Sequence, residues 1–356
     1  MKNYNSADTY HVIGIMSGTS LDGLDLAYCR FGKEETGWTF NVLNGKTIPY
    51  SDEWKTRLNE IGNGTALEFV KFDNELGHFI GKEVRRFIDE YDLQPDLVAS
   101  HGHTIFHQPN EGFTTQIGNG SAIRSYVDVP VVFDFRSLDV ALSGQGAPLV
   151  PIGDELLFSD YDYCLNLGGI SNVSYRHNGK RIAYDISPCN MALNYLANKL
   201  NLPYDKDGGI AERSVVDTAL YGTLNLVEYY SIKGPKTLGK EWFDKHFSPL
   251  LDTPDCSVES RLRTVTEHIA YQIAESLSSL PEGKLIVTGG GALNKFLVRK
   301  MQELTRHEIV TPHVSIINYK EALIFAFLGL LKMRGDVNSL ASVTGAKTDS
   351  CSGCVV

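Results

Sequence analysis

The sequence predicts an α/β fold built as two related lobes, and three observations lead to this prediction. First, its 356 residues exceed what a single hydrophobic core usually supports. Second, β-branched runs such as residues 11–16 and 284–288 alternate with helical patterns such as residues 257–280, which is typical of layered sheets and helices. Third, a strand, a glycine-containing polar turn and a second strand occur twice, at residues 11–31 and 163–175. One such hairpin in each half indicates two lobes of similar design.

The lobe boundary is expected near a glycine-rich break at residues 143–148, SGQGAP. We predict a first lobe over residues 1–135 and a second lobe over residues 136–340. The segment 341–356 is expected to return to the first lobe. A late apolar stretch, residues 321–331, predicts a buried helix that is too short to span a bilayer.

Composition and charge exclude several functional classes. Apolar residues make up 42% of the chain and charged residues 21%, as in ordinary globular proteins. The net charge of −10 argues against a nucleic-acid partner held by phosphate neutralisation. Residues 1–9 are polar and lack a signal core, so a cytoplasmic protein without a membrane partner is expected. The six scattered cysteines indicate reduced thiols, and the single CxxC of Cys351 and Cys354 is interpreted as an exposed tail rather than a metal site.

The first candidate binding segment is Ser17–Asp25, SGTSLDGLD, at the turn of the first hairpin. Glycines let backbone N–H groups approach a phosphate closely, and the hydroxyls of Thr19 and Ser20 add donors. The carboxylates of Asp22 and Asp25 suit such a cradle only with a divalent metal between them and the phosphates. A tight turn with solvated carboxylates is an equally good interpretation of this composition alone.

The second candidate combines Leu167–Asn172, LGGISN, with Asp185, which follows the apolar residues 182–184. A carboxylate at a strand end beside a cleft is well placed to be a general base. The alternative is that Asp185 caps the helix expected after Pro188, because Asp is a strong N-cap residue.

The third candidate is Val287–Asn294, VTGGGALN, a strand followed by three glycines and a helix. The glycines permit close packing of a flat ring or of phosphates, but the segment matches neither G-x-G-x-x-G nor the Walker pattern. A loop with three histidines, at positions 101, 103 and 107, is a weak metal signal, and ring hydrogen bonds are the better interpretation.

The order of these segments resembles the two phosphate segments and the adenosine segment of the actin–hexokinase–heat-shock-protein superfamily. Within it, long strings over nearly the whole chain are similar to the anhydro-N-acetylmuramic acid kinase family. The matching strings are IGIMSGTSLDGLD at 13–25, SHGHTIFHQP at 100–109, QIGNG at 116–120, FDFRSLDVALSGQGAPLVP at 133–151, LNLGGISN at 165–172, PKTLGKEWF at 235–243, TGGGALN at 288–294 and SVTGA at 342–346.

The resemblance implies a two-lobed actin-like ATPase (ribonuclease H-like) fold with a nucleotide and sugar cleft between the lobes. It implies a kinase that opens the 1,6-anhydro ring of anhydro-N-acetylmuramic acid with water and phosphorylates O6, in cell-wall recycling. Asp185 is then the catalytic base, and Arg136, Glu321 and His101 are expected to bind the sugar. ATP is expected to be bound by Gly18, Thr19, Ser20, Leu21, Asp22, Gly23, Leu24, Asp25, Gly168, Gly169, Gly289, Gly290 and Gly291.

No metal site made by the protein alone is expected, because Mg²⁺ would arrive with ATP, near Asp22 or Asp185. A homodimer is implied by the resemblance alone. Two departures from the family pattern concern sugar specificity: DISP at 185–188 where the family usually reads DTGP, and HGHT at 101–104 where it usually reads HGQT. The alternatives are a kinase of the same fold for a different sugar and a non-catalytic, actin-like nucleotide-binding regulator.

Overall fold

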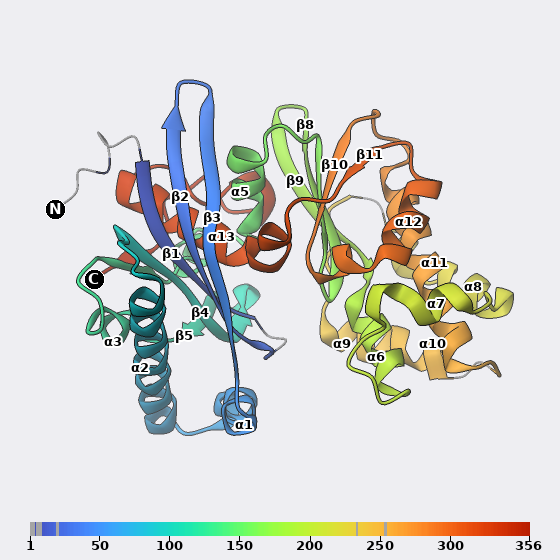
Figure 1. Ribbon diagram of the computed structural model, residues 1–356, viewed down its shortest axis with the longest axis horizontal. Helices are drawn as coiled ribbons and strands as arrows, with labels where there is room; N and C mark the ends of the chain where they lie inside the picture. The colour runs from blue at the N-terminus through green and yellow to red at the C-terminus, as the bar shows by residue number, and fades with distance from the viewer. Residues whose placement is uncertain (1–3, 5–8, 19–20, 233, 253–254) are drawn as a thin grey trace. The chain divides into compact units, whose positions relative to one another are not determined.

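A computed structural model of the protein describes residue 4 and residues 9–18, 21–232, 234–252 and 255–356. The chain forms two compact units: unit 1 comprises Met1–Phe158 and Tyr319–Val356, and unit 2 comprises Ser159–Asn318 (Figure 1). Two units and the return of residues 341–356 to the first were predicted, but both boundaries lie elsewhere. The chain leaves unit 1 only after residue 158, because helix α5 (Val150–Leu157) packs there on strand β3 (Gly37–Pro49). It re-enters at Tyr319, well before residue 341.

Unit 1 is organised around a mixed sheet in the order β12-β6-β4-β1-β2-β3, with β5 paired to β4, which makes seven strands among the described residues. β2 pairs antiparallel with β1 and β3, whereas β4 runs parallel to β1 and β6 parallel to β4. The other strands are β1 (Thr9–Ser17), β2 (Gly23–Glu34), β4 (Leu97–Gln108), β5 (Phe113–Ile117), β6 (Val131–Phe133) and β12 (Cys354–Val355), and the other helices are α1 (Asp52–Glu60), α2 (Ala66–Tyr91), α3 (Gly120–Arg124), α4 (Ser137–Ala141), α13 (Val314–Arg334) and α14 (Ala341–Thr344).

Alternate residues of β1 face two different helices, as the two-residue period of a strand requires. Ile13 and Ile15 join the apolar cluster that includes Leu76 and Ile80 of α2. Gly14 faces α13, where a Cβ atom would lie 1.9 Å from the carbonyl oxygen of Ala322, so only glycine permits this approach. The sheet of unit 1 is therefore covered by α2 on one face and by α13 on the other (Figure 1).

Helix α13 is longer than the sequence predicts. It spans Val314–Arg334, with one non-helical residue, Tyr319, at the point where unit 1 resumes. Its length and composition would suffice to cross a membrane, but the residues from Ala322 to Leu328 are at most 1% exposed. This burial is that of a core helix.

Unit 2 contains a second mixed sheet, in the order β11-β10-β7-β8-β9. β8 pairs antiparallel with β7 and β9, whereas β10 runs parallel to β7 and β11 parallel to β10. The strands are β7 (Tyr163–Leu167), β8 (Ile170–His177), β9 (Lys180–Pro188), β10 (Lys284–Thr288) and β11 (Glu308–Val310), and the helices are α6 (Asn190–Asn198), α7 (Gly209–Arg213), α8 (Thr218–Asn225), α9 (Lys240–Trp242), α10 (Ser248–Asp252), α11 (Val258–Leu277) and α12 (Lys295–Leu304).

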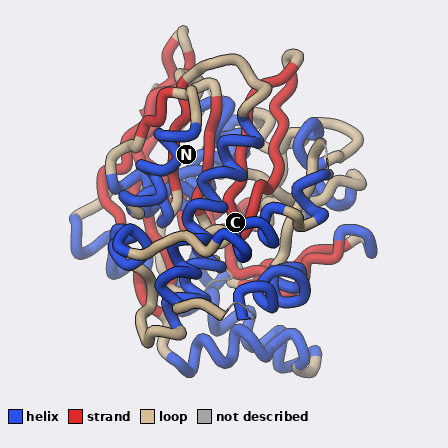
Figure 2. The backbone as a smooth tube through the Cα atoms, turned by 90° about the vertical axis from the view of Figure 1, so that its right-hand side faces the viewer, coloured by secondary structure: helices blue, strands red, loops and turns tan. Residues whose placement is uncertain are grey.

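The two units share one topology. In each unit, three consecutive strands pair antiparallel, as β1-β2-β3 and β7-β8-β9. Two further strands lie on the other side of the first of these three and run parallel to it, which gives the orders β3-β2-β1-β4-β6 and β9-β8-β7-β10-β11. Figure 2 shows the strands in red and the helices in blue. This duplicated order is the ribonuclease H-like arrangement of actin-like ATPases, so the predicted fold class is confirmed.

Three local predictions need correction. Residues 101–104 are not a loop, because β4 continues to Gln108 through Gly102, whose φ of 72° accompanies a register shift against β1. Asp185 lies within β9 rather than at its end. The C-terminal CxxC is not a free tail, since β12 pairs with β6 and Cys351 is half-buried; both cysteines are free thiols.

Candidate active-site groups in the two units

The turn of the first hairpin begins at a buried polar cluster. Of the predicted ATP-binding residues, Thr19 and Ser20 lie outside the described residues. The hydroxyl of Ser17, the last residue of β1, is hydrogen-bonded to the Tyr50 hydroxyl at 2.8 Å and to Nδ1 of His103 at 2.9 Å. Burial lowers the pKa of His103 to about 4, so the ring is neutral near pH 7. The start of the hairpin turn is thereby fixed to β4.

The two carboxylates of this hairpin have different surroundings. Asp22 is exposed, whereas Asp25 on β2 is half-buried and accepts a 2.6 Å hydrogen bond from the Thr47 hydroxyl. Burial raises the pKa of Asp25, and the nearby charge of Asp22 raises it further. The interpretation as solvated turn carboxylates therefore holds for Asp22 and fails for Asp25.

Arg136 and His101, both predicted to bind sugar, are joined in unit 1. Nε of Arg136 donates to Nε2 of His101 at 3.0 Å, and Nδ1 of His101 donates to the Gly102 carbonyl at 2.9 Å. This pair of bonds requires the neutral Nδ1–H tautomer. Burial lowers the pKa of His101 well below its usual value, and the Arg136 charge lowers it further, which agrees with that tautomer.

Glu321, the third predicted sugar-binding residue, belongs to the same group. The residue keeps an exposed surface, but the surrounding protein atoms displace water from its carboxyl group. This desolvation raises the pKa of Glu321. The guanidinium of Arg136 opposes the rise, while Asp25 adds to it. Burial lowers the pKa of Arg136 to about 10, against the opposing effects of Glu321 and Asp139, so Arg136 is cationic near neutral pH. Unit 1 thus brings together a cation and two carboxylates, with a neutral imidazole beside the cation.

Asp139, which was not among the residues predicted from the sequence, holds this group in place. Asp139 is fully buried and its carboxylate accepts hydrogen bonds from the Gly146 amide at 2.8 Å, the Ser339 hydroxyl at 2.7 Å and the Thr344 hydroxyl at 2.8 Å. The Gly146 carbonyl in turn accepts from Nη1 of Arg136 at 2.6 Å. The matching strings FDFRSLDVALSGQGAPLVP and SVTGA contain all of these residues except Ser339, but their contact could not be read from the strings.

In unit 2 the glycine turn of the second hairpin contacts the start of α6. The carbonyl of Gly168 accepts from the Asn190 amide at 3.0 Å, and that of Gly169 accepts from the Cys189 and Met191 amides at 2.8 and 3.0 Å. The first amides of α6 are therefore satisfied within the protein. Asp185 makes no capping bond to α6, so the alternative role considered for it is wrong.

The third glycine segment lies against the second hairpin. A Cβ atom on Gly289 (φ 79°) would lie 2.5 Å from Oδ1 of Asn166, and one on Gly291 would lie 2.7 Å from Cβ of Leu167. A Cβ atom on Gly290 would meet nothing closer than Nδ2 of Asn190, at 3.6 Å. Two of the glycines are thus required for packing, whereas a Cβ atom on Gly290 would make only an ordinary contact with Asn190.

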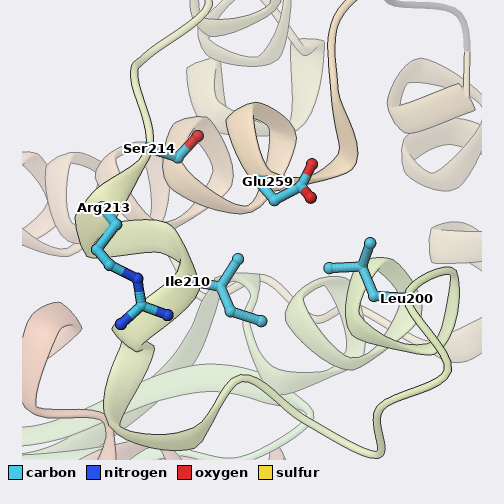
Figure 3. A pocket seen from close by; sticks show the side chains of 5 residues that line it. All are labelled: Leu200, Ile210, Arg213, Ser214 and Glu259. Atoms are coloured by element: carbon cyan, nitrogen blue, oxygen red, sulfur yellow. The ribbon is translucent and has the colours of Figure 1, made fainter.

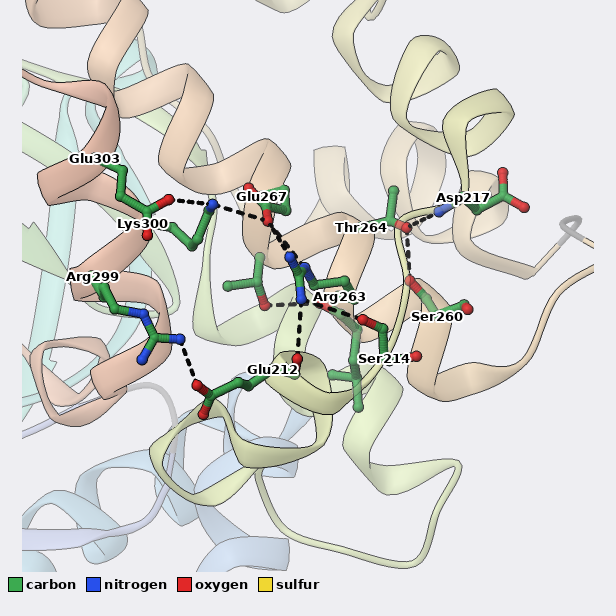
Figure 4. A network of polar contacts seen from close by, with 12 residues as sticks. Glu212, Ser214, Asp217, Ser260, Arg263, Thr264, Glu267, Arg299, Lys300 and Glu303 are labelled. Carbon is green, nitrogen blue, oxygen red and sulfur yellow. Dashed lines mark hydrogen bonds and ion pairs between the residues drawn. The ribbon is translucent and has the colours of Figure 1, made fainter.

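Helix α12, which follows these glycines, is tied to α7 and α11 by ionic contacts (Figure 4). Arg299 of α12 pairs with Glu212 of α7 at 2.6 Å, and Lys300 pairs with Glu267 of α11 at 3.4 Å. Arg263 of α11 pairs with Glu267 at 2.9 Å. Asn294 caps α12 by accepting from the Leu297 amide at 3.0 Å. These contacts fix the helix that carries the glycine segment.

Asp185 is held by one of its two carboxylate oxygens. Oδ2 accepts from the Leu238 amide at 2.8 Å and from the Thr237 hydroxyl at 3.0 Å, and no described residue donates to Oδ1. Burial raises the pKa of Asp185, and these two hydrogen bonds oppose the rise. A carboxylate with one free oxygen and a raised pKa can act as a general base.

The histidines and Ser187 are engaged in hydrogen bonds. His101 and His103 are bonded as described, and Nδ1 of His107 lies 3.1 Å from the Thr114 hydroxyl, which confirms the interpretation as ring hydrogen bonds. Among the described residues, no three His, Cys, Asp or Glu side chains gather closely enough to hold a metal ion. The Ser187 hydroxyl is buried against that of Ser171 at 3.1 Å, so it does not replace the threonine hydroxyl of the family's DTGP.

The cavity drawn in Figure 3 lies apart from these groups. It has a volume of ≈ 310 Å³ in unit 2, and none of the predicted site residues lines it. Its lining residues are Leu200, Ile210, Arg213, Ser214 and Glu259.

The duplicated topology and the two glycine hairpins define an actin-like ATPase fold. Comparison with known proteins identifies the family. The sequence profile of anhydro-N-acetylmuramic acid kinase matches residues 10–356. The anhydro-N-acetylmuramic acid kinase of Vibrio cholerae serotype O1 is 34% identical to the chain, over 94% of the chain and 95% of the relative. The corresponding kinase of Caldanaerobacter subterraneus subsp. tengcongensis is 31% identical, over 98% of the chain and 96% of the relative. The chain belongs to the anhydro-N-acetylmuramic acid kinase family.

Among solved structures, the activator of the 2-hydroxyisocaproyl-CoA dehydratase from Clostridium difficile with bound ADPNP has a TM-score of 0.46 at 12% identity, and the similarity covers 91% of this chain and 96% of that one.

Proposed function

We propose that the protein is an ATP-dependent kinase that opens the anhydro ring of anhydro-N-acetylmuramic acid and phosphorylates O6, in peptidoglycan recycling. The observation that carries the proposal is the family match along nearly the entire chain. Water adds to C1, the C1–O6 bond breaks, and O6 attacks the γ-phosphoryl group of ATP. One proton leaves the water, and the products are N-acetylmuramic acid 6-phosphate and ADP.

The unit 1 group supplies the contacts that a polar sugar requires. Arg136 is held by Gly146 and His101, so its remaining N–H groups have a fixed direction. Glu321 is accessible to solvent and can accept hydrogen bonds from sugar hydroxyls. Because His101 is neutral, it adds no second positive charge beside the sugar. His103, which stands where the family usually has glutamine, is hydrogen-bonded to Ser17 inside the protein. This internal contact favours the family's own sugar as the substrate over a different sugar.

Asp185 is the residue proposed to take the proton from the attacking water. General bases work best when their pKa lies close to the working pH, and burial moves the pKa of Asp185 in that direction. The free oxygen, Oδ1, is the acceptor available for this proton.

The proposed nucleotide contacts are the glycines of both hairpins and of the 289–291 segment. Gly290 is exposed, so its backbone is accessible to the ring of a bound adenosine. Mg²⁺ bound with ATP would neutralise the charge that develops on the phosphates. Magnesium prefers carboxylate oxygens, and Asp22 and Asp25 are the carboxylates beside the first hairpin turn that could contribute them. A cytoplasmic homodimer is part of the same proposal.

The product formed from Mg-ATP and the anhydro sugar tests the reaction. Mass spectrometry should find one product whose mass is the sum of the sugar, one water and one phosphoryl group. Phosphorylation of other sugars instead would favour a kinase of different specificity. Nucleotide-dependent polymerisation without ATP consumption would favour a regulator.

The role of Asp185 is tested by the Asp185→Asn variant. We expect turnover to fall by a factor of about 10² or more, the usual contribution of a general base, while calorimetry shows nearly unchanged ATP binding. Asp252→Asn is the matched control, because Asp252 pairs with Lys199 at the surface of unit 2 and should leave turnover unchanged. Near-normal turnover of Asp185→Asn removes the residue from the mechanism.

A further inference from the structure

The edge of the unit 2 sheet shows how Asp185 is held. β9 is an edge strand, so the backbone groups on its outer side need partners other than a strand. The Asp185 amide donates to the Lys236 carbonyl at 2.9 Å, and the Tyr229 hydroxyl donates to the Asp185 carbonyl at 2.8 Å. With the Thr237 and Leu238 bonds to Oδ2, four hydrogen bonds join Asp185 to Tyr229 and residues 236–238.

Irregular pairing of β9 explains why Asp185 has this direction. Asn172 of β8 is opposite Asp185, but Ser171 is opposite Ser187, so Ile186 has no partner and the register shifts there. Such a bulge turns the neighbouring side chains away from the regular alternation. The direction of the Asp185 carboxylate is then fixed by its own hydrogen bonds rather than by the sheet.

The segment that holds Asp185 is itself anchored in unit 2. Nζ of Lys236 donates to the Tyr229 carbonyl at 3.0 Å and lies 4.4 Å from the centre of the Tyr229 ring. The next residue, Tyr230, is hydrogen-bonded through its hydroxyl to Nε2 of the fully buried His268 at 2.8 Å. Leu238 is buried, whereas Thr237 is exposed. The contact from Thr237 can therefore be removed without opening the core.

We propose that Thr237 is a positioning residue, whose hydroxyl holds Oδ2 of Asp185 so that Oδ1 faces the water that attacks the sugar. This inference rests on the proposed function. The hydroxyl and the Leu238 amide both donate to Oδ2, and such hydrogen bonds are stronger to a carboxylate than to a neutral carboxyl group, so they favour the charged base that the reaction needs. Thr237 does not touch the reacting atoms; it acts through Asp185.

Loss of this hydroxyl has a defined effect on pH dependence. Hydrogen bonding to the ionised form lowers a carboxyl pKa, so its removal raises the pKa of Asp185. Because the base must be ionised, the acid limb of the profile of kcat against pH moves to higher pH. The described titratable side chains beside Asp185 in unit 2 are Tyr184, Tyr229 and Lys236; burial raises the pKa of Tyr229, away from this limb, and lowers the pKa of Lys236.

The test compares Thr237→Val, which keeps the shape and removes the donor, with Thr237→Ser, which keeps the donor. We expect Thr237→Val to lower kcat about tenfold and to move the acid limb up by about half a pH unit or more, with KM for ATP unchanged. Thr237→Ser should restore most of both. Thr223→Val on α8, which loses only a surface bond to the Ala219 carbonyl, is the matched control and should leave both unchanged.

The outcomes separate this inference from the proposed function. If Thr237→Val keeps the wild-type pH profile while Asp185→Asn is inactive, the positioning role is refuted and the base stands. Equal loss of kcat in Thr237→Val and Thr237→Ser, with an unmoved acid limb, also refutes it. If Asp185→Asn turns over normally, the proposed base itself is wrong.

Discussion

Replacement of Asp139 by alanine tests how the arginine group of unit 1 is held. The buried carboxylate accepts from Gly146, Ser339 and Thr344. Each hydrogen bond to a charged acceptor contributes about 1.5 kcal/mol or more, so loss of all three should cost about 4–5 kcal/mol of unfolding free energy. The loop that carries the Gly146 carbonyl also loses its anchor, so Arg136 becomes less ordered. We therefore expect KM for the sugar to rise as well.

Urea denaturation followed by tryptophan fluorescence measures this change. In a Trp242→Phe background the remaining tryptophans, Trp38 and Trp54, both lie in unit 1 and report its unfolding. Ser339→Ala, which removes a single donor, should cost only about 1–2 kcal/mol. Asp128→Ala, at an exposed position, should stay within about 0.5 kcal/mol of wild type. A loss below about 1 kcal/mol for Asp139→Ala would refute the argument that this carboxylate organises the loop.

Two further predictions concern pH and the glycine segment. The pKa of His103 is about 4 in the folded protein and about 6.5 when unfolded, so its contribution to stability is complete above pH 6.5 and is lost as the pH falls towards 4. Because of this ring, the free energy of unfolding should be about 2 kcal/mol lower at pH 5 than at pH 7.5. His103→Gln should remove that part of the pH dependence in urea titrations. An unchanged dependence of the unfolding free energy on pH would contradict the burial of this ring. Gly289→Ala should lower thermal stability by about 2 kcal/mol or more, because its Cβ atom would collide with Asn166 and its φ is 79°. Gly290→Ala should leave the melting temperature close to wild type but weaken ATP binding about tenfold by calorimetry; unchanged binding would exclude a ring packed on Gly290.

Local features of the fold were predictable because their causes are local. The β-branched runs and the Gly/Ser/Asp turns predict both hairpins, and Lys284–Thr288 was placed correctly as a strand. The stretch at residues 101–104 was misassigned, since histidine and glycine are poor strand formers and the bulge at Gly102 depends on pairing with distant strands. The length of α13 was underestimated because its first turns, residues 314–320, are of mixed polarity and lie outside the continuous apolar run.

The site was predictable only in part. Arg136, His101, Glu321 and Asp185 were assigned through family resemblance, and the structure joins the first three in unit 1. The residues that hold them were not found, since Thr237 is 52 positions from Asp185 and Ser339 is 200 positions from Asp139. No local pattern records contacts over such separations. They depend on which strands and loops the fold brings together.

The insertion of unit 2 between the two parts of unit 1 has a consequence for synthesis on the ribosome. The sheet face that contains Gly14 is covered by the part of α13 that follows Tyr319, which is translated only after all of residues 159–318. Until then the nascent chain carries an uncovered apolar surface, including the fully buried Val12 and Leu97. Unit 2, being continuous in sequence, can complete its core first. Slow elongation through residues 159–318 would prolong that exposure, so the demand for chaperones during translation should come from the first unit rather than the second.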